Sequence, residues 1–139
     1  MQYLQQLLST YPFLIPLVVL LLSELVKVIN RIREGSGERL FFRQGGMPSS
    51  HSAFVMSLLI VVGRKMGIES IEFAIALCFA GIVWYDAIAV RGTVSKHAKA
   101  LNVMQEIHQF SEEVGHTVLE VIAGIAFGAF VTGIGILLS

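Results

Sequence analysis

Four apolar stretches dominate the sequence and constrain its fold more than any other feature. They run over about 11–29, 52–63, 71–90 and 114–138. A helix needs about 20 predominantly apolar residues to cross the hydrocarbon core of a bilayer. The second stretch is short, because Arg64 and Lys65 close it, and it reaches spanning length only if it begins near Ser49. Since backbone groups in lipid must be satisfied within the segment, the pattern predicts helices.

The composition agrees with a chain that has lipid as its main solvent. Hydrophobic residues make up 55% and charged residues 14% of the 139 positions, whereas soluble domains carry about 25% charged residues. Ten basic and ten acidic residues cancel, so the charge balance indicates no nucleic-acid partner. The single cysteine, Cys78, excludes a disulfide framework and a cysteine-rich metal site. We expect one all-α domain over 1–139, an integral membrane helical bundle of about four transmembrane helices plus an interfacial amphipathic helix.

The distribution of charge predicts the topology. Residues 1–10 contain no Lys or Arg, and no small-residue cleavage site follows the first stretch, so we read it as a retained span and not a signal peptide. Four crossings place 30–50 and 91–113 on one side of a cell or organelle membrane, and 64–70 with both termini on the other. The first side and its flanks carry Lys27, Arg31, Arg33, Arg39, Arg43, Arg91, Lys96 and Lys99. Because basic residues prefer the cytoplasm, we predict that these loops are cytoplasmic.

The polar segment 91–113 has a periodicity of its own. Apolar residues recur at helical spacing, at Val94, Ala98, Leu101, Met104 and Ile107, with charged and polar residues between them. This pattern favours an amphipathic helix at the membrane interface. It fits equally well a soluble hairpin arm that packs on the loop before it.

The most distinctive motif reads Gly-Gly-Met-Pro-Ser-Ser-His-Ser and begins at Gly45. Gly45 and Gly46 allow the backbone to come close to a ligand. Pro48 suits the first turn of a helix, where its missing N–H costs nothing, and Ser49 or Ser50 can cap the second span. The motif therefore predicts a helix start whose N–H groups and hydroxyls face the polar side, which is an anion-binding arrangement.

His51 lies within this motif and can give or take a proton near neutral pH. All these parts together, in a membrane protein, favour a site that binds a phosphate group and cleaves it. The alternative is a capped helix start with a histidine at the membrane interface.

A second group of polar residues opens the fourth apolar stretch. His116 and Glu120 are four residues apart, so they share one face of a helix. A carboxylate beside a histidine can fix its tautomer and raise its basicity. A carboxylate one turn into an apolar helix is expensive and needs a partner. That partner is either His116 or a cation from another helix.

At this point the sequence resembles a known superfamily, the type-2 phosphatidic acid phosphatases with the bacterial acid phosphatases and vanadium haloperoxidases. Residues 48–51 are similar to its Pro-Ser-Gly-His motif, with serine for glycine, and His116 to Glu120 is similar to the end of its third motif, with glutamate for aspartate. Phe110 stands where the superfamily has an arginine, and its lysine-containing first motif is absent in strict form.

The resemblance is closer to a divergent branch of small membrane proteins, described as acid phosphatase/vanadium-dependent haloperoxidase-related. It covers the chain from Lys27 onward. Besides the Gly-Gly-Met-Pro-Ser-Ser-His-Ser motif, the branch has short motifs that match Tyr85-Asp86-Ala87, Val90-Arg91, Leu101-Asn102 and 115–121.

Asp86 and Arg91 have two readings. In the structural reading, Asp86 pairs with Arg91 or with Lys27 and fastens helices. In the functional reading, Arg91 supplies the phosphate clamp that Phe110 cannot, and Asp86 orients it. Glu24 with Lys27, three residues apart in the first span, is read as a structural pair.

The resemblance implies a metal-independent phosphatase without a cofactor. His116, oriented by Glu120, attacks phosphorus to form a phosphohistidine, and His51 is the acid and then the base. The residues implied to hold the phosphate are Gly45, Gly46, Ser49, Ser50, Arg43, Arg91 and Lys27. A site at the membrane edge suits a lipid phosphate or pyrophosphate with its tail in the bilayer.

Two other functions fit the same residues: a non-catalytic lipid-phosphate binding protein or carrier, and a purely structural membrane subunit. The oligomeric state is a separate question. Gly124 and Gly128 have the small-x-x-x-small spacing at which helices pack closely. That stripe serves either a homodimer or packing within one chain.

Overall fold

A computed structural model describes residues 3, 6, 10–33, 46–105, 109–112 and 114–138. The regular structure of these residues is entirely helical, which confirms the all-α prediction. The elements are α2 (Leu14–Arg33), α3 (Ser50–Met66), α4 (Ile71–Tyr85), the π-helical turn η2 (Asp86–Val90), α5 (Arg91–Met104) and α6 (Val118–Leu137). Gly45, Arg43 and Arg39 of the sequence-based predictions lie outside the described residues.

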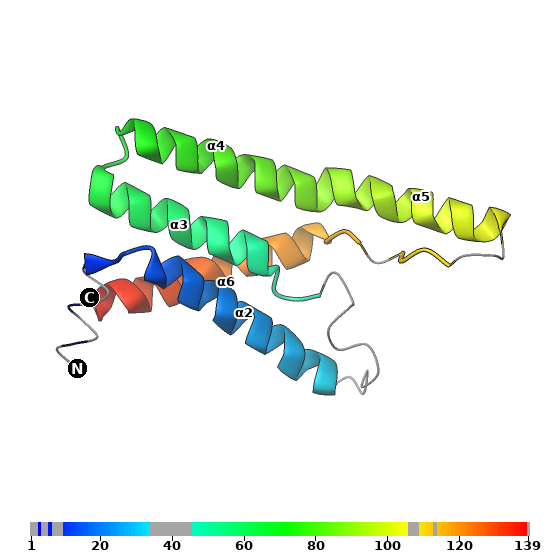
Figure 1. Ribbon diagram of the computed structural model, residues 1–139, viewed down its shortest axis with the longest axis horizontal. Coiled ribbons are helices and arrows are strands. Elements are labelled where there is room, and N and C mark those ends of the chain that lie inside the picture. The colour runs from blue at the N-terminus through cyan, green and yellow to red at the C-terminus, as the bar shows by residue number, and fades with distance from the viewer. Residues whose placement is uncertain are drawn as a thin grey trace.

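Helix α3 lies at the centre of the bundle. It packs against α2, α4 and α6, and Figure 1 shows it between the long upper rod and the lower pair of helices. The residues that α3 buries are mostly small, among them Ser52, Ala53 and Ser57. Small residues let neighbouring backbones approach closely, which is how helices associate where lipid removes the hydrophobic driving force.

The glycine stripe of α6 packs against this central helix. A Cβ atom on Gly124 would lie 2.3 Å from the carbonyl oxygen of Ser49, and one on Gly128 would lie 2.3 Å from that of Ala53. One turn further on, Thr132 Oγ1 lies 2.6 Å from Ser57 Oγ. The stripe therefore serves packing within one chain and is not available to a second copy.

Among the residues that the structure describes, two helices are long and apolar enough to cross a membrane, Ile71–Met104 and Val118–Leu137. The surface of the bundle supports a lipid solvent, because α2 and α4 expose large apolar side chains such as Leu21, Ile75 and Ile82. The protein is thus a helical membrane bundle. Four crossings remain a prediction, since α2 contains four charged residues and α3 has 17 residues.

Segments α4, η2 and α5 form one continuous rod of 34 residues, roughly 50 Å long at 1.5 Å per residue. The predicted amphipathic helix is α5, which buries Ala98 and exposes Lys96 and Lys99. It extends beyond the bundle in line with α4 (Figure 1). The chain then returns beside it, where the Asn102 side chain accepts from Phe110 N–H at 2.8 Å and donates to the Phe110 carbonyl at 2.9 Å. The segment thus contains the predicted amphipathic helix and, after it, a return of the chain that contacts the end of that helix.

The helix ends lie at the two ends of the bundle in the arrangement that the topology prediction requires. The end of α2, the start of α3, the α5 arm and the start of α6 lie at one end of the bundle (Figure 1). The start of α2, the α3–α4 turn and the end of α6 lie at the other. The two polar motifs therefore share one end of the molecule.

Candidate active site

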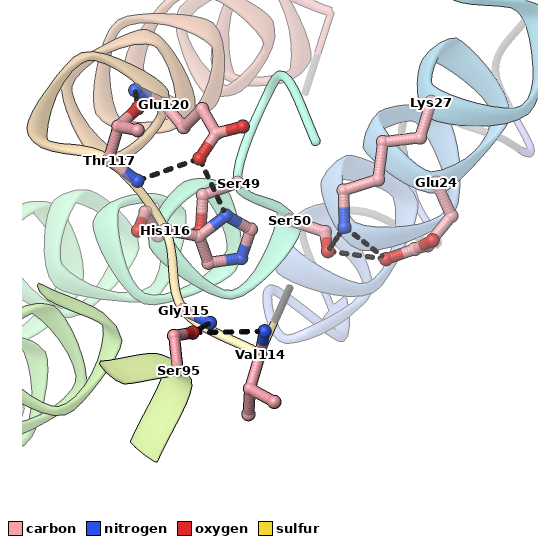
Figure 2. Close-up of polar contacts among 11 residues, drawn as sticks. Glu24, Lys27, Ser49, Ser50, Ser95, Val114, Gly115, His116, Thr117 and Glu120 are labelled. Carbon is pink, nitrogen blue, oxygen red and sulfur yellow. Dashed lines mark hydrogen bonds and ion pairs between the residues drawn. The ribbon is translucent and has the colours of Figure 1, made fainter. Parts of the chain in front are cut away.

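The starts of α3 and α6 meet directly. The backbone N–H of Ser49 donates to the carbonyl of Glu120 at 3.1 Å, and Gly124 packs on Ser49 one turn further into α6. Figure 2 shows the His116 ring beside the start of α3. Two motifs that are far apart in the sequence thus form one site.

A complete capping box fixes the start of α6. Glu120 N–H donates to Thr117 Oγ1 at 3.2 Å, and Thr117 N–H donates to Glu120 Oε2 at 2.7 Å. Reciprocal contacts of this kind satisfy two backbone donors that would otherwise lack partners. The Glu120 carboxylate is therefore held by its own helix, so its orientation does not depend on a ligand.

The same carboxylate oxygen faces His116. Glu120 Oε2 lies 3.4 Å from His116 Nδ1, close enough for electrostatic coupling. The contact is too poorly aligned to be a hydrogen bond, so Nδ1 is buried without a hydrogen-bond partner in the described structure. Catalytic hydrogen bonds are often long before substrate binds. With Nδ1 facing a carboxylate, the proton of the neutral ring belongs on Nδ1, which leaves the lone pair on Nε2.

Burial lowers the pKa of His116 below its ordinary value of 6.5. Glu120 opposes this shift of the pKa, whereas the positive charges of Lys27 and Arg91 add to it. The side chain is 6% exposed. The imidazole is therefore neutral at neutral pH.

The start of α3 differs from the sequence-based prediction. Pro48 precedes the N-cap residue Ser49 instead of standing in the first turn, and the Ser49 side chain makes no capping hydrogen bond. Its hydroxyl accepts from Ser52 Oγ at 2.9 Å. Ser49 and Ser50 are fully buried, so their hydroxyls do not face the polar side as predicted. The backbone N–H groups of the first turn of α3 receive no hydrogen bond from the N-cap side chain.

Lys27 is buried, with 7% of its surface exposed, and it joins α2 to α3. Its Nζ donates to Ser50 Oγ at 2.7 Å and to Glu24 Oε1 at 3.0 Å. Ser50 Oγ in turn donates to Glu24 in a short hydrogen bond. The predicted structural pair of Glu24 and Lys27 is confirmed. The contact of this pair with Ser50 was not predicted. The sequence signal for it is the Glu24 carboxylate within an apolar span, because such a group needs partners.

Arg91 and Asp86 pair with each other, as one reading of the sequence predicted. Arg91 Nε lies 2.7 Å from Asp86 Oδ2, and both side chains are partly exposed. The π-helical turn brings these residues, five apart, onto one edge, because the Arg91 N–H donates to the Asp86 carbonyl. The alternative pair of Asp86 with Lys27 does not form, since Lys27 is held by Glu24 and Ser50.

His51 is exposed on the first turn of α3. The charges of Arg91 and Lys27 act on both His51 and His116, which places the two histidines in one electrostatic environment. Gly46 has a φ of +100°, a conformation that favours glycine, and a Cβ atom there would lie 4.0 Å from Arg31 Nη2. Within the described ranges, no group of three His, Cys, Asp or Glu side chains is arranged to hold a metal ion.

Comparison with known proteins gives an independent result. A family model described as the divergent PAP2 family matches residues 8–131. The chain is 34% identical over 102 residues to the uncharacterized membrane protein YuiD of Bacillus subtilis (strain 168), an alignment that covers 70% of this chain and 63% of YuiD. The chain thus spans less than two thirds of that relative's length, and no solved structure matches it. This protein belongs to the divergent PAP2 family.

Proposed function

We propose that this protein is a membrane phosphatase that hydrolyses lipid phosphates or pyrophosphates through a phosphohistidine at His116. The observation that carries the proposal is the meeting of the two helix starts. A buried, neutral His116 beside Glu120 lies against a first turn of α3 that has no side-chain cap. Membership of the divergent PAP2 family agrees with phosphate chemistry.

In this mechanism, Nε2 of His116 attacks phosphorus and forms an N–P bond while the bond from phosphorus to the lipid oxygen breaks. His51 donates a proton to the departing oxygen. The ring of the phosphohistidine carries a positive charge, which the nearby Glu120 carboxylate stabilises. His51 then accepts a proton from water, and the resulting hydroxide attacks phosphorus, breaks the N–P bond and releases inorganic phosphate.

The phosphate oxygens are held by charge and by backbone donors. We assign them to the first-turn N–H groups of α3, a helix N-terminus that favours anions. The terminal nitrogens of Arg91 complete the clamp, and Asp86 orients that guanidinium through Nε. Lys27 adds positive charge near the phosphate while its Nζ remains hydrogen-bonded to Glu24 and Ser50.

The location of the site favours a lipid substrate. The helices that flank it expose apolar side chains such as Leu25 on α2 and Ile82 on α4. A phosphate at the helix starts then lies in water while its hydrocarbon tail lies in the bilayer. From the charge asymmetry of the loops, we propose that this end of the bundle faces the cytoplasm.

A second function, lipid-phosphate binding without cleavage, is favoured by one observation. Both described cations that act on His116 and His51 already hold carboxylates, Lys27 with Glu24 and Arg91 with Asp86. Such pairs reduce the positive field that would stabilise the charge of a phosphoryl-transfer transition state. A carrier with the same residues would bind lipid phosphates and release them unchanged.

Phosphate release from a panel of lipid phosphates separates the two functions. The full chain is purified in nanodiscs as wild type, His116→Ala and His51→Ala, with His97→Ala, an exposed histidine on α5, as the control. We expect the His116 variant to fall to background, the His51 variant to lose about a hundredfold or more, and the control to match wild type. A ³²P label retained on wild type but not on His116→Ala would identify the phosphohistidine. Hydrolysis at the wild-type rate by folded His116→Ala would disprove the mechanism, and binding without release by wild type would establish the carrier.

A further inference from the structure

The loop that carries His116 is held by the long rod opposite. Ser95 Oγ accepts hydrogen bonds from the N–H groups of Val114 and Gly115, each at 3.2 Å. The N–H of His116 itself donates to the carbonyl of Ala87 at 3.0 Å. Figure 2 shows Ser95 beside the loop just before the imidazole. The rod, through Ser95 of α5 and Ala87 of η2, thus accepts hydrogen bonds from three successive backbone N–H groups of the loop.

The π-helical turn explains how a carbonyl of the rod reaches this loop. In an α-helix, the Arg91 N–H would donate to the carbonyl four residues back, which is that of Ala87. Here it donates to Asp86, five residues back. The Ala87 carbonyl accepts from His116 instead. The π turn that pairs Arg91 with Asp86 therefore also anchors His116, and π turns are frequent at functional sites.

A close backbone contact completes the attachment. A Cβ atom on Gly115 would lie 2.8 Å from the backbone nitrogen of Gly92 and 2.9 Å from the carbonyl carbon of Arg91. A Cβ atom on Gly92 would meet nothing within 4 Å. The contact therefore requires glycine at position 115 but not at position 92. Alanine substitutions at these two positions form a matched pair of test and control.

We propose that Ser95 is a positioning residue for His116, acting through the backbone that precedes it. Ser95 lies one helical turn beyond Arg91 in α5. The same rod therefore carries the Arg91 cation and holds the backbone that positions the His116 imidazole. The inference rests on the proposed function for its effect on catalysis. The attachment itself is a property of the folded chain, so it can be tested separately.

The first test measures the attachment without substrate. Full-length protein in nanodiscs is compared as wild type, Ser95→Ala, Ser95→Thr and Ser111→Ala, the last being an exposed serine on the same loop. We expect amide exchange at Val114 and at Gly115 to rise about tenfold in Ser95→Ala, because each of the two amides loses its hydrogen bond to Ser95. Ser95→Thr keeps an acceptor oxygen and Ser111→Ala removes an uninvolved hydroxyl, so both should match wild type. Wild-type exchange in Ser95→Ala would overturn the inference.

The second test measures catalysis. Because misalignment of a nucleophile slows chemistry more than it weakens binding, Ser95→Ala should lower kcat about tenfold with KM within about twofold, and Ser95→Thr should restore kcat. Gly115→Ala should lower kcat further, while Gly92→Ala should match wild type. Equal loss in the Gly92 and Gly115 variants, or unchanged kcat in Ser95→Ala, would overturn the inference.

A ¹⁵N titration of the His116 imidazole distinguishes failure of this inference from failure of the proposed function. The groups that act on that ring are Glu120, Lys27 and Arg91. If wild type hydrolyses no lipid phosphate, the phosphatase proposal fails. A His116 titration that moves in Ser95→Ala and not in Ser111→Ala still supports positioning, and a titration that stays unchanged overturns it.

Discussion

Two helices begin at the candidate site, and they begin in opposite ways. The start of α6 is satisfied by its own side chains, because Thr117 and Glu120 form a complete capping box. The start of α3 has an N-cap serine whose hydroxyl makes no capping bond, and side chains from α2 hold the next residue, Ser50. Under the proposed function, each helix start has its own role. The self-capped start holds the Glu120 carboxylate beside His116, and the start of α3 supplies backbone donors for an anion.

The largest effect on kcat is expected from a substitution that separates the two contacts of Glu120, the capping of α6 and the charge beside His116. Glu120→Gln keeps an oxygen that can accept from Thr117 N–H but removes the charge beside His116. If the proposed mechanism holds, kcat should fall at least about a hundredfold, since an orienting carboxylate that is lost from a catalytic triad can cost more than this. Thermal unfolding should change little. A fall in stability without a fall in kcat would mean that Glu120 serves only the cap.

Thr117→Ala is the complementary change, because it removes the capping hydroxyl and leaves the carboxylate. It should cost about 1 kcal/mol of stability and lower kcat only slightly. Denaturant unfolding with lipid-phosphate hydrolysis on the same samples measures both. The comparison of the two helix starts would fail if the Thr117 and Glu120 variants gave the same pattern.

The next effect tests the contact between the two starts. Gly124→Ala places a methyl group 2.3 Å from the Ser49 carbonyl oxygen, which is backbone and cannot give way without moving α3. We expect about 1–3 kcal/mol of destabilisation from overpacking, and a lower kcat because the helix starts are forced apart. The matched control is Gly133→Ala, whose Cβ meets nothing within 4 Å. Equal unfolding temperatures for the two variants would contradict the packing described for α6.

A smaller effect is expected from the side-chain anchor of α3. Lys27→Met leaves Glu24 without its ion pair, and because that carboxylate is half exposed we expect a loss of only about 1–2 kcal/mol. The double variant Lys27→Met with Glu24→Gln removes both charges and should recover part of the stability. A double-mutant cycle by thermal unfolding gives the coupling. Additive losses would show that the Glu24–Lys27 contact contributes nothing.

The smallest effect concerns pH. The pKa of folded His116 is lowered from 6.5, so the neutral ring is favoured by folding. This contribution to stability is complete above the unfolded pKa and is lost as the pH falls through the folded pKa. Stability should therefore begin to fall on acidification below about pH 6.5, and the rate of the proposed reaction should fall as the pH drops through the lower pKa of folded His116. His116→Asn should flatten the stability profile in that acidic range. An unchanged profile in that variant would assign the pH dependence to another group.

Much of the site was predictable because its determinants are local. Asp86 and Arg91 are five apart in one continuous rod, and His116 lies beside Glu120 as expected. The expected reason for the second contact was wrong, because His116 precedes the N-cap residue Thr117 and meets Glu120 at the start of α6, not along a shared helix face. Pro48 was expected in the first turn but lies just before the N-cap residue Ser49, because helix starts are decided by contacts as well as by residue type. Here the N–H of Ser49 goes to Glu120, from a helix that sequence pattern alone does not place.

The class of the protein, a helical membrane bundle with two polar motifs at helix starts, could be predicted from the sequence. Apolar length and helical spacing are properties of consecutive residues, so no tertiary information is needed to read them. The tertiary structure decided which groups distant in the sequence meet. It buried the hydroxyls of Ser49 and Ser50, brought Lys27 into contact with Ser50 and placed Gly124 and Gly128 of α6 against α3. These outcomes depend on which of several compatible partners lies within reach once the helices have packed, and that is fixed by non-local geometry.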